Sequence, residues 1–163
     1  MTQPDDRSLS HVGADGAAKM VDVSGKPETQ RVARAGGSIR MAAATLAAIR
    51  ANTLKKGDVI AVSRVAGVMA AKRTAELVPL CHPIALTDVQ VEITPDDALP
   101  GLRAEATVRC FGRTGVEMEA ISAVCVTLIT VFDMVKAVDK ELVISDVRVL
   151  EKSGGRSGSW KQG

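Results

Sequence analysis

Residues 86–110 read LTDVQVEITPDDALPGLRAEATVRC, and this stretch contains two runs in which apolar and polar residues alternate. The alternation covers LTDVQVEI and LRAEATVRC, and TPDDALPG between them is rich in turn-forming residues. A period of two residues is typical of strands that place one face on the core and the other in water. The stretch therefore predicts two antiparallel strands joined by a turn.

The segments on the N-terminal side of this pair predict one strand and a helix in two pieces. Residues 29–40, TQRVARAGGSIR, alternate partially around two glycines, which favours an edge strand with a bend. The alanine-rich residues 41–54 read as helix, and Asp58 can cap a second helix that must end before Pro79. The residues that recur at helical spacing in this second helix are Val62, Val65, Ala66, Met69 and Arg73.

The C-terminal side predicts a long helix and a last strand. TGVE at 114–117 has the form of a capping box, and the apolar helix that it opens is expected to run to about Val138. In the last strand, within ELVISDVRVL, the expected inward positions are Val143, Val147 and Val149.

The expected order is strand, helix, strand, strand, helix, strand. This order predicts an α+β, ferredoxin-like β-α-β-β-α-β fold, a four-stranded antiparallel sheet with its helices on one face. We expect one domain over residues 21–152, a disordered polar tail over 1–20 and a flexible Gly/Ser-rich tail over 153–163.

The composition argues against several classes of protein. Aromatic residues make up 2% of the 163 residues and the net charge is +2, so nucleic-acid binding by stacking or by a strong basic field is not expected. The three cysteines form no close pair, which favours a reducing compartment. The N-terminus has no signal-peptide pattern, and no uncharged apolar run reaches the ~20 residues of a membrane span. We therefore expect a cytoplasmic protein that does not bind membranes.

LVPLCHPI, at 77–84, places Cys81 beside His82. Structural zinc needs four convergent ligands and a thiol nucleophile needs a nearby base, and the sequence offers neither set of partners. No metal site is expected. Two interpretations stay open for His82: a satisfied polar residue in a proline-stiffened loop, or a positioned hydrogen-bond donor.

Asp133 and Lys136 lie three residues apart, on one face of the predicted long helix and directly after its apolar stretch. The pair is either an exposed ion pair near a helix C-terminus or an acid–base pair with shifted pKa values. Glu117 is explained first as a helix cap, while Glu119 points to another side of the helix. Glu119 and Asp133 are ~21 Å apart along one helix, so a site that used both would join two subunits.

Cationic residues gather at predicted helix ends and in loops, and KSGGRSG at 152–158 has glycines that suit an anion-binding nest. Together they suit a polyphosphate, although exposed, solvated charges explain them equally well. The sequence contains no Walker A motif and no dinucleotide-binding glycine motif.

Seven blocks occur in order along nearly the whole chain: KMVDVS, KKGDV, AGVMAAKRT, LVPLCHPI, TGVEMEA, FDMVKAVDK and KSGGRSG. Together they resemble the MoaC-type family of cyclic pyranopterin monophosphate synthases. Two residues depart from the family pattern: Phe132 stands where tyrosine is common, and Val135 where cysteine is common.

The resemblance implies a ferredoxin-like lyase of molybdenum cofactor biosynthesis. Its substrate would be 3′,8-cyclo-7,8-dihydroguanosine 5′-triphosphate, supplied by a radical-SAM GTP cyclase, and its products cyclic pyranopterin monophosphate and diphosphate. The family assembles as a hexamer, a trimer of dimers, with pockets at a subunit interface. No cofactor is required, and magnesium is compatible with the triphosphate.

The resemblance also implies roles for individual residues. The family's catalytic residues fall on Asp133, Lys136, Lys56 and His82. Substrate contacts fall on Leu80, Cys81, His82, Glu117, Met118, Glu119, Lys72 and Lys152. The alternative is a non-catalytic, nucleotide-binding ferredoxin-like module that regulates a partner.

Overall fold

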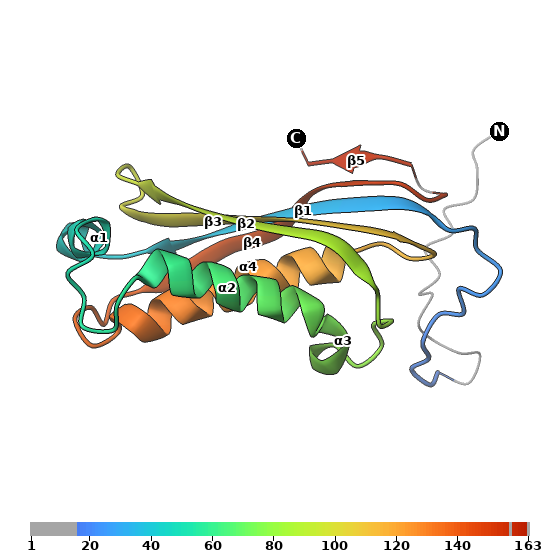
Figure 1. The fold of residues 1–163 in the computed structure, drawn as a ribbon, viewed down its shortest axis with the longest axis horizontal. Coiled ribbons are helices and arrows are strands. Elements are labelled where there is room, and N and C mark those ends of the chain that lie inside the picture. Colours follow the sequence, from blue (N-terminus) through green and yellow to red (C-terminus); the bar gives the residue numbers. More distant parts are fainter. Residues whose placement is uncertain (1–15, 157, 163) are drawn as a thin grey trace.

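The computed structural model describes residues 16–156 and 158–162. The chain forms a single antiparallel sheet whose one face is covered by two long helices, α2 and α4, which lie side by side (Figure 1). The strands are β1 (Thr29–Arg40), β2 (Leu86–Asp96), β3 (Gly101–Gly112), β4 (Val143–Ser153) and β5 (Trp160–Lys161). The helices are α1 (Ala43–Arg50), α2 (Val59–Lys72), α3 (Thr74–Leu77) and α4 (Glu117–Val135).

The strand order β2-β3-β1-β4-β5 confirms the ferredoxin-like fold, because the first four strands have the arrangement expected of β-α-β-β-α-β. The sheet has five strands where we expected four. The extra strand is the two-residue β5, which pairs with β4 through Glu151 and Lys152. It lies inside the segment 153–163, whose flexibility stays a prediction, and most of the predicted N-terminal tail lies outside the described residues.

The expectation that residues 29–40 form an edge strand was wrong, because β1 lies in the middle of the sheet between β3 and β4. Its two glycines make room for side chains on both faces. A Cβ on Gly37 would lie 2.9 Å from Leu128 of α4, and a Cβ on Gly36 would lie 2.9 Å from Leu150 on the other face. The glycines that suggested a weak edge therefore allow close packing at the centre.

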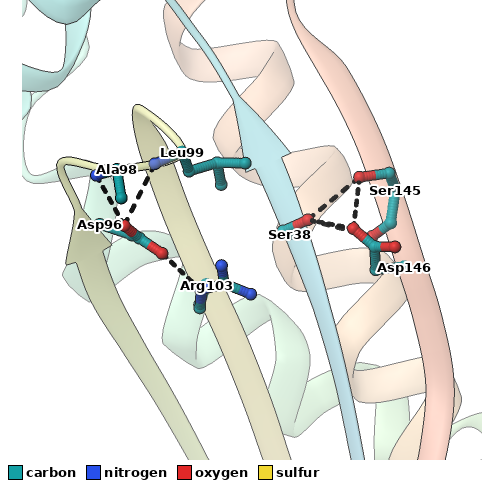
Figure 2. Close-up of polar contacts among 7 residues, drawn as sticks. All are labelled: Ser38, Asp96, Ala98, Leu99, Arg103, Ser145 and Asp146. Carbon is teal, nitrogen blue, oxygen red and sulfur yellow. Dashed lines mark hydrogen bonds and ion pairs between the residues drawn. The ribbon is translucent and has the colours of Figure 1, made fainter.

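The last strand does not keep the predicted alternation, since Val143 is 42% exposed while Val147 packs against the core. The cause is an irregular register with β1, where Asp146 has a positive φ of 58°. Figure 2 shows how this point is held: Ser38 and Ser145 donate hydrogen bonds of 3.1 and 2.9 Å to the Asp146 carboxylate. An inserted residue reverses the faces of the side chains around it, so a strict period of two fails here.

The turn between β2 and β3 is fixed by one carboxylate, as Figure 2 also shows. Asp96 accepts hydrogen bonds from the backbone amides of Ala98 and Leu99, and it pairs with Arg103 at 2.6 Å. These contacts explain why the hairpin predicted from 86–110 turns at TPDDALPG.

Helix α2 is capped by the Asp58 side chain, which accepts from the Ala61 amide at 2.9 Å as predicted. Its buried face is made of small residues, Val59, Ser63, Gly67, Ala70 and Ala71. Three larger apolar residues of the helix point outward instead: Val62, Val65 and Met69 are 46–60% exposed, whereas Ile60 and Val68 pack against the core. The small face allows α2 and α4 to approach closely, since a Cβ on Gly67 would overlap the Thr127 hydroxyl of α4.

Helix α4 supplies the largest share of the core, with Val124, Leu128 and Val131 fully buried. Its length and composition alone would allow it to cross a membrane. However, 56% of that window is buried inside the fold, as is usual for the central helix of a soluble protein.

Candidate active site

A cavity of about 420 Å³ lies between the loop that follows α3 and the N-terminal end of α4; we call it the loop pocket. It joins the two motifs that the sequence singled out, although 36 positions separate Cys81 from Glu117. The predicted site residues in its lining are Leu80, Cys81, His82, Glu117, Met118 and Glu119. Cys81 and His82 are both half-buried, and the loop therefore presents them to the cavity.

A second cavity, of about 610 Å³, adjoins the loop pocket and is lined by five cationic side chains; we call it the basic pocket. These cations are Lys26, Arg31, Arg113, Lys152 and Arg156. Lys152 among them was predicted as a substrate contact, and Arg156 belongs to the segment KSGGRSG, which was predicted to suit a polyphosphate. Such a concentration of cations around a concave surface suits an anion with several charges.

Arg31 is the most buried of these cations, at 9% exposed. Its guanidinium donates hydrogen bonds of 3.2 Å to the carbonyl oxygens of Gly112 and Arg113, and no carboxylate pairs with it among the described residues. A buried cation with no anionic partner requires compensation by a ligand or by dipoles. The sequence contained one sign of this buried cation. Arg31 occupies the same face of the strand as Ala33 and Ala35, and that face points to the core.

The turn after β4 closes the basic pocket with two successive glycines at positive φ, Gly154 at 97° and Gly155 at 76°. Side chains are excluded at both positions, because a Cβ on Gly155 would overlap the Arg31 guanidinium and a Cβ on Gly154 would overlap the Gln30 carbonyl. The glycines of KSGGRSG therefore let the backbone pass directly over Arg31. Binding of an anion by this turn stays a prediction.

Glu117 does not cap α4, so the predicted capping box was wrong. The helix begins after Val116 without any side-chain cap, and the Glu117 carboxylate instead pairs with Lys152 at 3.0 Å. The tertiary structure brings this lysine of β4 to the helix end, and an ion pair replaces the local hydrogen bond. Glu117 thus lines both cavities, and its partner Lys152 lines the basic pocket.

Glu119 is buried, at 3% exposed, on the wall of the loop pocket. Burial raises the pKa of its carboxyl from 4.5 to about 7; a hydrogen bond from the residue's own backbone opposes this rise, and the charge of Glu117 adds to it. Burial, followed by the charge of Glu119, also raises the pKa of the Cys81 thiol. A raised pKa keeps the thiol neutral, which agrees with the prediction that Cys81 is not a thiolate nucleophile.

The other predicted catalytic residues gather at the far end of α4, where Asp133 joins two lysines. Lys136 pairs with one carboxylate oxygen at 2.7 Å, and Lys56 pairs with the other at 2.8 Å. Hydrogen bonds from Lys136, then from Lys56, lower the pKa of Asp133 to about 2. Asp133 is therefore ionised near neutral pH, and in this cluster only the lysines can donate protons.

The structure does not bring all the predicted residues together. The loop pocket lies at the start of α4 and the Asp133 cluster at its end, ~21 Å away by the rise of the helix. Lys72 meets neither group and lines a third cavity with Leu86 and Val89. One small substrate bound to a single chain therefore contacts only one of these groups.

The residues described contain no group of three or more His, Cys, Asp and Glu side chains placed to hold a metal ion. Of the cysteines outside the loop pocket, Cys110 is buried and Cys125 is half-buried.

Comparison with known proteins gives a consistent result. The model of the MoaC family matches residues 20–155. The chain is 57% identical over 152 residues to proteins named cyclic pyranopterin monophosphate synthase from Brucella ovis and Brucella melitensis biotype 2. Each alignment covers 93% of this chain and 92% of the relative.

Proposed function

The chain belongs to the MoaC family, and from that premise we propose that it converts 3′,8-cyclo-7,8-dihydroguanosine 5′-triphosphate to cyclic pyranopterin monophosphate and diphosphate. It is a lyase of molybdenum cofactor biosynthesis. One observation supports this reaction most: the loop pocket adjoins the basic pocket, and the two share Lys26, Thr114, Gly115 and Glu117 in their linings. A ring system joined to a triphosphate needs such a pair of cavities.

In this reaction the basic pocket holds the phosphates and the loop pocket holds the ring. Arg31 and Arg113 present guanidinium groups, which suit phosphate oxygens. His82 and Glu119 face the ring. Because the pKa of Glu119 is about 7, part of the enzyme carries a protonated carboxyl at neutral pH that can donate a hydrogen bond or a proton.

The Asp133 cluster supplies the remaining acid–base groups. Both carboxylate oxygens of Asp133 are occupied by ammonium groups, so Asp133 holds Lys56 and Lys136 close to one another. A lysine of the pair transfers protons as the purine-derived ring opens and the pterin closes. A sugar hydroxyl then attacks the inner phosphate and diphosphate leaves. No redox step is needed.

The site is completed by a second subunit, in a hexamer built as a trimer of dimers. Two features support this assembly. The two catalytic groups lie at opposite ends of α4, and α2 presents an outward apolar face at Val62, Val65 and Met69. Exposed apolar side chains in one contiguous row are typical of subunit contacts. Lys72 would then reach the substrate from a neighbouring chain.

The enzyme acts in the cytoplasm and requires no cofactor of its own. Any magnesium enters with the triphosphate, whose charges favour the ion. The substrate comes from a radical-SAM GTP cyclase.

The decisive test supplies the cyclic dihydro-GTP intermediate to the purified enzyme and measures diphosphate together with the oxidised pterin. Asp133→Asn and Lys136→Ala variants are expected to keep the oligomer and lose turnover. Near-wild-type product formation by either variant would contradict the assignment. A non-catalytic nucleotide-binding module would bind the substrate without releasing diphosphate.

Subunit mixing tests the shared site separately. Glu119→Ala and Asp133→Ala subunits each lack one group, but a hybrid oligomer contains some pockets with both groups intact. Recovered activity is expected after mixing. No recovery, with subunit exchange shown by mass spectrometry, would place each site within one chain.

A further inference from the structure

The segment Val21–Glu28, which we call the N-terminal strap, forms part of the wall of the loop pocket. A turn closes within it, since the Lys26 amide donates to the Val23 carbonyl at 3.0 Å. Arg113 fastens the strap to the loop before α4: it donates to the Ser24 carbonyl at 3.2 Å and lies 3.6 Å from the Glu28 carboxylate. The strap is thus held in a defined position over the site.

Lys26 differs from the other residues of this strap, because it lines both the loop pocket and the basic pocket. The other residues common to the two linings are Thr114, Gly115 and Glu117. Glu117 is an anion already neutralised by Lys152. Lys26 is half-buried and makes no ion pair within residues 16–156 and 158–162. Among the residues that the structure describes, it is therefore the cation without an ion-pair partner that lines both cavities.

The order of groups in the proposed substrate determines what lies where the two cavities adjoin. The ring and sugar occupy the loop pocket, and the two outer phosphates lie among the cations of the basic pocket. The inner, α-phosphate connects them. We propose that Lys26 binds the α-phosphate and stabilises the charge that develops on it during cyclisation, an inference that rests on the function proposed above.

The chemistry of that step explains why a cation is useful there. The oxygen of a sugar hydroxyl forms a bond to the α-phosphorus, and the bond from that phosphorus to the bridging oxygen of the diphosphate breaks. The hydroxyl proton passes to solvent, and the electron pair leaves with the diphosphate. An ammonium group on the non-bridging oxygens favours this transition state over the ground state.

The inference has a sharp test because the α-phosphate remains in one product and is absent from the other. Binding of cyclic pyranopterin monophosphate and of inorganic diphosphate is measured separately by calorimetry, for the full-length oligomeric enzyme. Lys26→Ala, and Lys26→Gln as a second variant, are expected to weaken binding of the pterin product about 10- to 100-fold, as for loss of a charged hydrogen bond. Diphosphate binding should change less than about 3-fold, since the four other cations of the basic pocket, Arg31, Arg113, Lys152 and Arg156, remain in place.

Two control variants test whether the effect is specific to Lys26. Lys19→Ala removes an exposed lysine just before the strap that lines neither cavity, and it should change neither affinity. Arg156→Ala removes a cation that lines only the basic pocket, and it should weaken diphosphate binding more than product binding. Turnover by the Lys26 variants should fall together with product affinity.

The outcomes separate this inference from the proposed function. If the wild-type enzyme neither forms nor binds the pterin product, the proposed function fails before any variant is compared. If the wild type is active and the Lys26 variants weaken both ligands equally, or neither, the assignment of Lys26 to the α-phosphate is wrong while the function stands.

Discussion

Replacing Glu119 by glutamine is expected to change how the stability of the protein depends on pH. The carboxyl is 3% exposed, and its pKa is about 7 in the folded chain against 4.5 for an ordinary glutamate. Between these two values the folded state binds a proton that the unfolded state has lost. The wild type therefore loses stability as pH rises through this window, whereas the neutral glutamine, of nearly the same shape, does not.

The size of the effect follows from the pKa difference. One pH unit of pKa difference corresponds to about 1.4 kcal/mol, so a rise from 4.5 to about 7 amounts to ~3 kcal/mol. This penalty is absent below the unfolded pKa and complete above the folded pKa. The free energy of unfolding of Glu119→Gln, relative to wild type, should therefore increase by ~3 kcal/mol from about pH 4 to about pH 8.

Urea unfolding followed by circular dichroism, at one protein concentration and several pH values, measures this difference. The exposed Glu92 on β2 provides a matched control, because Glu92→Gln should shift stability by a constant small amount. A carbon-13 titration of the glutamate carboxyls would report the pKa of Glu119 directly. A stability difference between Glu119→Gln and wild type that stays constant across this pH range would refute the reasoning.

Three further substitutions test the packing around the site. Gly67→Ala should destabilise the protein by about 1–3 kcal/mol, because the new methyl group would overlap the Thr127 hydroxyl. Adding Thr127→Ala should recover part of this loss in thermal melts, and an additive loss would contradict the contact. Asp139→Asn should lower the free energy of unfolding by about 1–3 kcal/mol in urea titrations. The buried Asp139 carboxylate accepts hydrogen bonds from the Ala42 amide at 2.8 Å and the Glu141 amide at 3.0 Å, one on each oxygen. The asparagine side chain has only one oxygen, so it can replace only one of these acceptors. Gly155→Ala should lower diphosphate affinity at least about 10-fold in calorimetry. The new Cβ would displace the Arg31 guanidinium of the basic pocket, and the φ of 76° at this position disfavours alanine. Unchanged affinity would show that this turn is not part of the site.

The sequence determined the architecture because its signals are local. Alternation in residues 86–110 reflects the two faces of a strand, and the sheet places those apolar residues on the core as predicted. The same holds for Asp58, which caps α2 through a contact three residues away. The pairing of Asp133 with Lys136 also follows from helical spacing alone.

The tertiary structure determined which partner a side chain binds where its neighbours in the sequence allow more than one. TGVE had the form of a cap, yet Glu117 turned to Lys152, which approaches from a strand 35 positions further along the chain. The apolar residues that recur at helical spacing in α2, Val62, Val65 and Met69, point outward. The small residues of α2 face α4 instead, because only small side chains allow the two helices to approach closely. Lys56 reached Asp133 across 77 positions, a contact that no periodicity contains. Periodicity states which face a side chain occupies, whereas its partner depends on which distant segment the fold brings to that face.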